Sequence, residues 1–428
     1  MKVKITGDHE NHGRLISGTF AVPGDKSISH RSVMLGAMAN GVTEITGFLT
    51  GEDCLSTISC FRALGVDIAL EGSNVTVKGI GNLTPPTQIL DVGNSGTTLR
   101  LMAGLLAGQP FTSTMTGDSS IQKRPMKRVV DPLTLMGAKI DGVYAPVTIE
   151  GARLNGIEYT LPVASAQVKS AIILAGLYAD GKTVIEEPTP TRDHTEIMLK
   201  HLGADISRHG DFITCRKSNL QAKAISVPGD ISSAAFLMVA AAILPGASVE
   251  IEGVGVNPTR TGIIHVLKRM GAKLTLKKER NICGEPVADI HVQQSPLKGT
   301  TLSGSEIPTL IDEIPAIAAA ALFAEGETII KDAEELRVKE TDRIKVVAEE
   351  FGKFFKESPI KTKKNGMIIK GCTQKLTGVE VDSQGDHRLA MSLAILALTA
   401  QGKTIINNAK CADVSFPGFY NLIPNAKI

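Results

Sequence analysis

The chain has 428 residues, of which 43% are apolar and 21% are charged, and its formal net charge is +2. This length exceeds what a single hydrophobic core usually supports, so we expect two domains. The nearly balanced charge and the low aromatic content, 4% with no Trp, argue against nucleic acid as the main partner.

The cysteines and the apolar segments set further limits. No two cysteines form a CxxC pair, so we expect no metal site and interpret the cysteines as reduced thiols of a cytoplasmic protein. The first 15 residues lack the apolar region of a signal peptide. The apolar stretch 234–247 is too short and too interrupted to cross a bilayer, so we expect buried helices and no membrane partner.

The first predicted helix begins in the segment PGDKSISHRSVML, residues 23–35. Pro23 and Gly24 indicate a turn, and Lys26 and Arg31 follow it at the start of the helix. The positive end of a helix dipole favours acidic side chains, so cations there are unfavourable unless an anion binds among them. The segment therefore predicts an anion site.

One structural plan recurs along the chain: a turn, a helix rich in small apolar residues, a Gly or Pro break and an alternating strand. The six copies begin at Val22, Asp91, Leu161, Val227, Ile307 and Val381. In several copies a second helix ends at a Leu-Gly or Met-Gly step, which is typical of a helix C-terminus. These steps contain Gly65, Gly137, Gly203 and Gly271. We expect two domains of three α/β units, with the first helices in the core and a boundary near Val227.

Most of the chemically interesting side chains occupy one position of this unit, the turn and the first helical turn. They are Lys26, Ser27, Arg31, Asn94, Gly96, Thr97, Arg100, Ser165, Gln167, Lys169, Asp312, Glu313, Asp386, His387 and Arg388. Equivalent positions of a pseudosymmetric body share one face. Helix N-termini and basic side chains gathered on one face form a receptacle for small polyanions.

Taken singly, these residues also have structural explanations. Ser27 can be a helix cap, and Gly96 a turn residue. Lys169 can be a solvated position, and Asp312 and Glu313 can be acids that the helix dipole favours. The recurrence of polar residues at one phase of the repeat favours the binding interpretation.

Two further segments are rich in cations. QKRPMKRVVDPL places Arg124 beside Pro125 and is interpreted either as a solvated charge run or as an anion clamp. LRVKETDRIKVVAEEFG predicts a helix in which Lys339 and Arg343 are neighbours at i,i+4, with Glu340 adjacent to Lys339. In isolation, that pattern is typical of a surface ion-pair ladder.

The segments GDKSISHR, GNSGTTLR, KRP, SAQVK, RDHTE, VKETDR and GDHR follow the order of the EPSP synthase (3-phosphoshikimate 1-carboxyvinyltransferase) family, and this resemblance covers essentially the whole chain. The motifs at Gly24–Lys26, Ser165–Lys169, Arg192–Glu196 and Asn257–Arg260 resemble class II of the family, whose members tend to tolerate the inhibitor glyphosate better. The resemblance implies a two-domain inside-out α/β barrel of the EPT/RTPC type. It places residues 21–227 in an N-terminal three-unit domain and residues 1–20 plus 228–428 in a C-terminal one.

The resemblance also implies a reaction. The carboxyvinyl group of phosphoenolpyruvate moves to the 5-hydroxyl of shikimate 3-phosphate by addition and elimination, with release of phosphate, on the shikimate pathway to chorismate and aromatic amino acids. No metal or organic cofactor is implied. The expected partners are these two small molecules, on which a monomer closes. Their phosphates and carboxylates are the anions that the helix starts predict.

Site residues follow by match to the family's motifs. Asp312 accepts the hydroxyl proton, Glu340 protonates the methylene carbon, and Lys26 assists either step. The implied shikimate 3-phosphate site comprises Lys26, Ser27, Arg31, Ser165, Gln167, Arg192, Asp312 and Lys339. The implied phosphoenolpyruvate site comprises Lys26, Gly96, Arg124, Gln167, Arg343 and Arg388.

Three other interpretations fit parts of the pattern. The sister enzyme that transfers the same group to UDP-N-acetylglucosamine uses a loop cysteine, and the matching loop DSSIQKRPM has none. A catalytically inactive anion-binding protein predicts missing carboxylates, whereas Asp312 and Glu340 are both present. An RNA 3'-phosphate cyclase, related in fold, expects a nucleotide site and a catalytic His, and nothing in the sequence singles one out.

Overall fold

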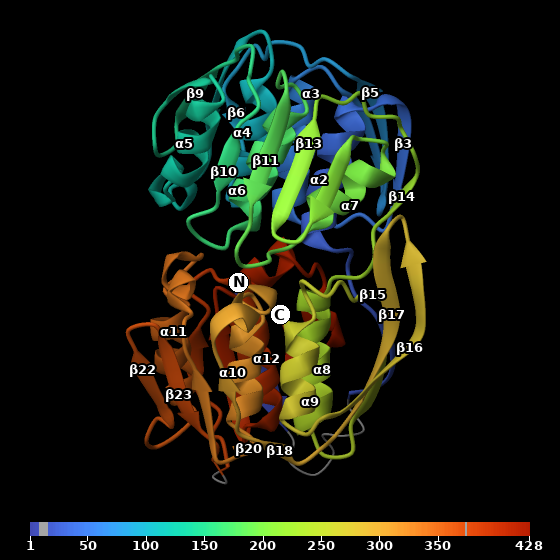
Figure 1. Cartoon of the computed structure of the whole chain (residues 1–428). Coiled ribbons are helices and arrows are strands. Elements are labelled where there is room, and N and C mark those ends of the chain that lie inside the picture. The colour runs from blue at the N-terminus through green and yellow to red at the C-terminus, as the bar shows by residue number, and fades with distance from the viewer. Residues whose placement is uncertain (8–15, 373–374) are drawn as a thin grey trace. The chain divides into compact units, whose positions relative to one another are not determined.

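The structure is a computed structural model that describes residues 1–7, 16–372 and 375–428. Contacts divide the chain into two compact units, which we call the N-terminal unit (Gly24–Pro228 and Asn281–Glu285) and the C-terminal unit (Met1–Pro23, Gly229–Arg280 and Pro286–Ile428). Each unit contains three copies of the repeated plan, and Figure 1 labels many of their elements.

The N-terminal unit holds the first three repeats. The first contains α2 (Lys26–Met38), β3 (Asn40–Thr46), α3 (Glu52–Ala63), β4 (Asp67–Glu71) and β5 (Asn74–Ile80). The second contains β6 (Leu90–Asp91), α4 (Gly96–Ala107), β7 (Thr112–Thr116), the 3₁₀ helix η1 (Ile121–Lys123), α5 (Lys127–Leu135), β8 (Lys139–Asp141) and β9 (Val147–Glu150). The third contains β10 (Glu158–Thr160), α6 (Ala166–Gly176), β11 (Lys182–Glu186), α7 (His194–His201), β12 (Ile206–His209), β13 (Phe212–Arg216) and β14 (Ile225–Ser226).

The C-terminal unit holds the other three repeats and the first two strands, β1 (Val3–Gly7) and β2 (Ser17–Ala21). The fourth repeat contains α8 (Ile231–Ile243), β15 (Ser248–Gly255), α9 (Gly262–Arg269), β16 (Lys273–Ile282) and β17 (Glu285–Gln293). The fifth contains β18 (Leu297–Lys298), β19 (Thr301–Leu302), η2 (Gly304–Thr309), α10 (Ile314–Ala321), β20 (Ala324–Glu325), β21 (Glu327–Ile330), η3 (Glu334–Val338), α11 (Arg343–Gly352), β22 (Ile360–Lys363) and β23 (Gly366–Lys370). The sixth contains β24 (Glu380–Asp382), α12 (His387–Thr399), β25 (Gly402–Asn407), η4 (Ala409–Val414), η5 (Phe419–Leu422) and β26 (Ala426–Lys427).

The sheets repeat one topology. In the described part of the chain there are six four-stranded sheets, for example β6-β7-β9-β8 and β10-β11-β13-β12. In both, the first pair is parallel and the other two pairs are antiparallel. The strands alternate between buried and exposed residues, as β5 does, so one face of each sheet packs on helices. The six-fold repeat predicted from the sequence is therefore confirmed.

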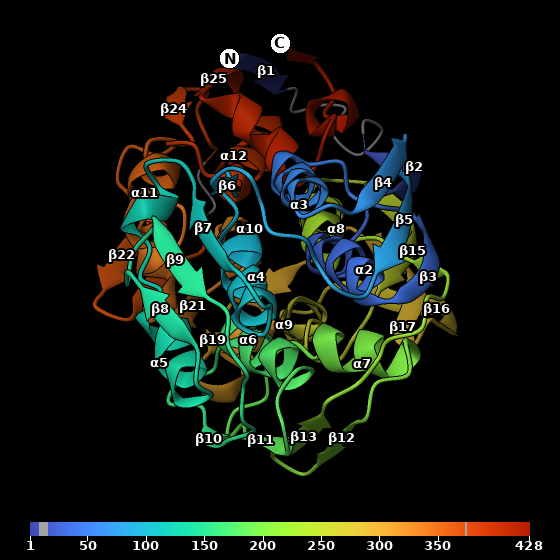
Figure 2. The same ribbon diagram turned by 90° about the horizontal axis from the view of Figure 1, so that it is seen from above.

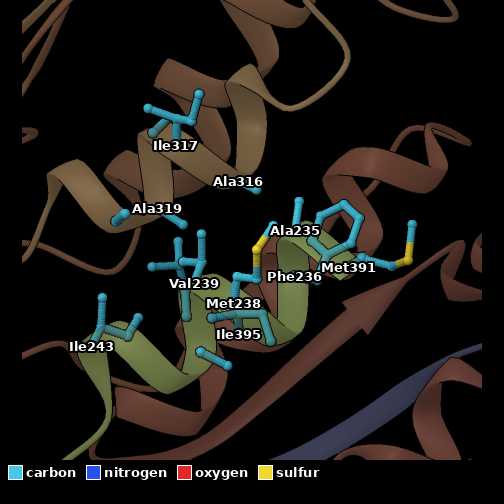
Figure 3. Packing of buried hydrophobic residues seen from close by; sticks show 14 of the residues in the cluster. Ala235, Phe236, Met238, Val239, Ile243, Ala316, Ile317, Ala319, Met391 and Ile395 are labelled. Atoms are coloured by element: carbon cyan, nitrogen blue, oxygen red, sulfur yellow. The ribbon is translucent and has the colours of Figure 1, made fainter. Parts of the chain in front are cut away.

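The first helix of each repeat lies in the core of its unit. All residues of α8, α10 and α12 are buried, and Figure 3 shows Val239 of α8, Ala319 of α10 and Ile395 of α12 among the packed side chains. Small side chains let these helices approach closely. In the N-terminal unit, seen in Figure 2, α2, α4 and α6 lie inside the ring of strands. A Cβ at Gly104 of α4 would lie 2.1 Å from the carbonyl oxygen of Ala171 in α6, so only glycine fits there.

The second helices end as predicted. Gly65, Gly137, Gly203 and Gly271 each follow such a helix with φ between +87° and +107°. In this left-handed conformation a side chain would be strained, and glycine turns the chain from the helix into the next strand.

The observed units differ from the expected domain boundaries at three places. Residues 21–23 lie in the C-terminal unit, because β2 runs parallel to β15 as far as Ala21 and the carbonyl of Pro23 accepts from Asp230 N at 2.9 Å. Residue 228 and the hairpin tip at 281–285 lie in the N-terminal unit. The tip joins that unit because Glu285 Oε1 lies 2.7 Å from His194 Nδ1 of α7.

Candidate active site

The first helices of the three N-terminal repeats are capped by residues other than Ser27. Asp25 caps α2 by accepting from Ile28 N at 2.9 Å, Ser95 caps α4, and Ser165 caps α6. Ser27 lies instead in the first turn of α2. The three caps occupy equivalent positions of the first three repeats.

Arg31 is a buried cation of α2. Its guanidinium donates to Thr195 Oγ1 at 2.7 Å, to Ser170 Oγ at 2.9 Å and to the carbonyl of Ser27 at 2.9 Å. All three acceptors are neutral. Burial lowers the pKa of Arg31 to about 10, and the charge of Glu196 opposes that shift. A buried guanidinium held by neutral oxygens is suited to bind an anionic ligand.

Lys26 and the second repeat add further positive charge. The Lys26 ammonium contacts the carboxylate of Asp53 on α3. Gly96 opens α4 between two guanidinium groups, because a Cβ there would lie 3.2 Å from Arg100 Nη1 and 3.4 Å from Arg124 Nη1. Arg100 Nη1 in turn donates to Gln167 Oε1 on α6 at 2.5 Å. A side chain at Gly96 would therefore crowd the two arginines.

The C-terminal unit contains a carboxylate cluster centred on Arg343, the first residue of α11. Its guanidinium donates to both oxygens of Asp386, at 2.8 and 3.2 Å, to Glu340 Oε2 at 2.7 Å and to Asp312 Oδ1 at 3.4 Å. Lys339 Nζ donates to the same oxygen of Asp312 at 3.3 Å. Burial by itself lowers the pKa of Arg343, but the three carboxylates outweigh it and the net shift is upward. The proposed acid and base thus share one cation.

The helix predicted for the VKETDR segment was wrong in its extent. The 3₁₀ helix η3 ends at Val338, Lys339 is extended, and α11 begins only at Arg343. Asp342 interrupts the helix because its side chain caps α11 by accepting from Lys345 N at 3.1 Å. Lys339 and Arg343 are consequently not neighbours on one helix face. Both reach Asp312 instead, and the ion-pair ladder is replaced by a cluster.

Arg388 lies at the start of α12 and is only 5% exposed. Within the described residues, its Nε and Nη1 atoms have no hydrogen-bond partner. Leaving donors of a buried cation unpaired costs free energy that a bound anion can recover.

The predicted site residues divide between the two units. The group in the N-terminal unit contains Lys26, Ser27, Arg31, Gly96, Arg124, Ser165, Gln167 and Arg192. The group in the C-terminal unit contains Asp312, Lys339, Glu340, Arg343 and Arg388.

Sequence reasoning missed several partners of these residues. Asp53 contacts Lys26, and Ser170 and Thr195 hold Arg31. Glu187 is the buried partner of Lys169, whose burial contradicts the solvated alternative. Thr195 lies within the RDHTE motif and Ser170 directly follows the SAQVK motif, whereas no sequence signal marked Asp53 or Glu187.

Metal clusters and membrane-spanning helices are both absent from the described residues. No group of three or more His, Cys, Asp or Glu side chains there has an arrangement that could hold a metal ion. Among the same residues, no helix is long and apolar enough to span a membrane.

Comparison with known proteins places these features in a family. Residues 11–423 match the family profile of EPSP synthase (3-phosphoshikimate 1-carboxyvinyltransferase). The chain is 56% identical to 3-phosphoshikimate 1-carboxyvinyltransferase of Thermoanaerobacter sp. (strain X514) over 412 residues, which is 95% of this chain and 97% of the relative. It is also 56% identical to the Brevibacillus brevis enzyme of that name over 415 residues, with the same coverage of 95% and 97%.

Solved structures of enolpyruvyl transferases share the fold of this chain. EPSP synthase from Acinetobacter baumannii superposes with a TM-score of 0.88 at 46% identity, covering 100% of this chain and 99% of that one. The enolpyruvyl transferase NikO from Streptomyces tendae shares the fold, with a TM-score of 0.80 at 18% identity and coverage of 99% and 96%. The α/β fold expected from the sequence is thereby confirmed. The chain belongs to the EPSP synthase (3-phosphoshikimate 1-carboxyvinyltransferase) family.

Proposed function

We propose that this chain catalyses the reaction of its family with Asp312 and Glu340 as the groups that move protons. The reaction transfers the carboxyvinyl group of phosphoenolpyruvate to the 5-hydroxyl of shikimate 3-phosphate and releases inorganic phosphate. The observation that carries the assignment is the cluster in which Arg343 contacts both Asp312 and Glu340, at 3.4 and 2.7 Å. An acid and a base are needed in alternate phases, and this cluster supplies two carboxylates beside cations.

The first phase is an addition. Asp312 takes the proton of the 5-hydroxyl while the oxygen bonds to C2 of phosphoenolpyruvate, and Glu340 gives a proton to the methylene carbon. The product is a tetrahedral phospho-ketal. In the second phase the phosphate leaves with the electron pair of its C–O bond, and the methyl group loses a proton to restore the carbon–carbon double bond. Fixed cations stabilise the leaving phosphate.

Arg343 links anion binding to the state of Glu340. Its guanidinium is 1% exposed and already holds Asp386, Glu340 and Asp312. An anionic substrate that contacts Arg343 competes with these carboxylates. Binding of that substrate therefore weakens the contact between Arg343 and Glu340, the proposed proton donor. Arg388, with unpaired donors, is the second proposed phosphoenolpyruvate contact in this unit.

Residues of the N-terminal unit supply the remaining proposed contacts. Arg31, with its neutral partners, and Arg192 are assigned to the anionic groups of shikimate 3-phosphate. Lys26 and Arg124 are assigned to phosphoenolpyruvate, and a side chain at Gly96 would crowd Arg124. Forked guanidinium contacts suit the planar carboxylate and the phosphate of these substrates.

The assembly and location of the protein are part of the proposal. We expect a monomer in the cytoplasm. The six cysteines form no disulfide in the described residues, as is usual in reducing compartments. Sedimentation equilibrium of the purified chain tests the monomer directly.

Phosphate release from phosphoenolpyruvate tests the proposed reaction. Shikimate 3-phosphate and UDP-N-acetylglucosamine are offered as acceptors in separate assays. The proposal predicts stoichiometric phosphate release with the first and none above background with the second. Release with UDP-N-acetylglucosamine alone would assign the chain to the sister reaction, and release with neither acceptor would reject the proposal.

A further inference from the structure

A buried ion cluster in the N-terminal unit has no part in the reaction described above. Lys169 on α6 is fully buried, and its Nζ lies 2.9 Å from Glu187 Oε1 and 2.8 Å from Glu196 Oε1. Arg208 Nη1 donates to Glu187 Oε2 at 2.7 Å. We call these four residues the Lys169 cluster. Its two cations balance its two carboxylates, so it contributes no net charge toward a ligand.

Stability alone does not explain such a cluster. Removing the charges of Lys169, Glu187 and Glu196 from water is costly, and apolar side chains of similar volume often stabilise a fold as well as a buried ion pair does. What the cluster provides is geometric constraint, because each buried charge must keep its partners. The residues to which it is bonded indicate what that constraint is for.

Thr191 is fastened to the cluster through all of its polar groups. Its backbone N–H donates to Glu187 Oε1 at 3.1 Å, and its hydroxyl donates to the same oxygen. Its carbonyl oxygen accepts from Lys169 Nζ at 3.4 Å. Arg192 is the next residue. The cluster therefore fixes the backbone from which the Arg192 side chain, a proposed ligand of the shikimate 3-phosphate phosphate group, departs.

Helices α6 and α7, which carry Lys169 and Glu196, also hold Arg31. Ser170 follows Lys169 on α6, and Thr195 precedes Glu196 on α7. Ser170 Oγ and Thr195 Oγ1 lie 2.7 Å apart, and each accepts from the Arg31 guanidinium. The Lys169–Glu196 pair thus joins α6 and α7 one residue away from the two hydroxyls that orient Arg31.

We propose that Lys169 is a positioning residue for the shikimate 3-phosphate site: through Glu187 and Glu196 it holds Thr191, and so Arg192, together with the hydroxyl pair that orients Arg31. This inference rests on the proposed function, because it assigns a role toward that substrate. It predicts selective loss of affinity for the phosphorylated ligand. None of the four residues of the Lys169 cluster is among the proposed contacts of either substrate.

The test compares two ligands that differ only in the phosphate. Isothermal titration calorimetry measures the affinities of shikimate 3-phosphate and shikimate for the full chain and for Lys169→Met. We expect the affinity for shikimate 3-phosphate to fall about tenfold or more, as for loss of one well-placed charged hydrogen bond, with a much smaller change for shikimate. A variant that is merely less stable would lose affinity for both ligands by the same factor.

A milder variant keeps the inference testable if Lys169→Met does not fold. Thr191→Val preserves shape and removes one bond to Glu187, so the ratio of the two affinities should fall about threefold. Thr43→Val is the matched control, because the hydroxyl of Thr43 on β3 is buried without a partner in the described residues. The control should leave the ratio unchanged.

The outcomes separate the inference from the proposed function. If the unaltered chain binds shikimate 3-phosphate no better than shikimate, the proposed function fails. If the unaltered chain prefers shikimate 3-phosphate and every folded variant of Lys169 or Thr191 keeps that preference, Lys169 does not position the site. A lower preference in Thr191→Val, but not in Thr43→Val, supports the inference.

Discussion

Replacing His30 by Asn should remove a pH-dependent part of the stability of the N-terminal unit. His30 on α2 is completely buried, and its Nδ1 lies 2.7 Å from Thr57 Oγ1, which lies 2.7 Å from Thr98 Oγ1. In the described residues its Nε2 has no partner. Burial lowers the pKa of His30 from 6.5 to about 3, and the charges of Lys26 and Arg31 act in the same direction while Asp53 opposes them. The ring is therefore neutral in the folded protein.

The difference between the pKa of His30 in the unfolded chain and in the folded chain sets the sign and size of the change in stability. Below pH 6.5 the unfolded chain protonates His30, whereas the folded chain does so only near pH 3. The contribution to stability is thus complete above pH 6.5 and is lost as the pH falls toward 3. Each pKa unit corresponds to about 1.4 kcal/mol, so the loss reaches about 3 kcal/mol at pH 4.

Denaturant unfolding between pH 7 and pH 4 measures this loss. His30→Asn keeps a polar atom near the Nδ1 position, and its packing cost does not depend on pH. The free energy of unfolding of the unaltered chain should approach that of the variant, or fall below it, as the pH drops. His209→Gln is the control, because His209 is exposed on β12 and should leave the slope unchanged. Parallel pH profiles for the unaltered chain and His30→Asn would refute a neutral, buried His30.

Three further variants probe the proposed site. Asp312→Asn should retain substrate binding by calorimetry but lose about 10²- to 10⁴-fold in the rate of phosphate release, and near-normal turnover would reject Asp312 as the base. Gly96→Ala should raise KM for phosphoenolpyruvate several-fold without unfolding the chain, because its Cβ would lie 3.2 and 3.4 Å from the flexible ends of Arg100 and Arg124; an unchanged KM in steady-state kinetics would separate Gly96 from that substrate. Arg388→Met should raise KM for phosphoenolpyruvate about ten- to a hundredfold. It should leave unchanged the affinity for shikimate 3-phosphate measured without phosphoenolpyruvate, and equal losses for both substrates would contradict the assignment of Arg388.

Much of the fold follows from local pattern. Each repeat carries its own apolar helix and its own turn. The helix that begins at Ile231, and the glycine at position 271 that follows the end of another helix, can therefore be predicted without any knowledge of contacts. The break before Arg343 was missed because the apolar spacing of the helix extends across the VKETDR segment. The capping signal of Asp342 was present, but it competes with that spacing and is decided by local hydrogen bonds.

The sequence supplies candidate site residues, but it does not supply the partners that hold their side chains. Arg343 meets carboxylates at positions 312, 340 and 386, and nothing in the spacing of those positions brings them together. Lys169 is similar, because Glu187 lies 18 residues away beyond a strand and is buried only through the packing of the third repeat. Pairings of this kind are set by tertiary structure, and local periodicity carries no record of them.

A crystal structure of the protein with shikimate 3-phosphate bound tests whether the first turns of α2 and α6 and the Arg192 side chain form the binding site for that substrate. The account predicts that the phosphate lies within hydrogen-bonding distance of the Arg192 guanidinium, and that Arg31 contacts an anionic group of the same molecule. Density for the ligand at any place remote from the first turns of α2 and α6 would contradict the account.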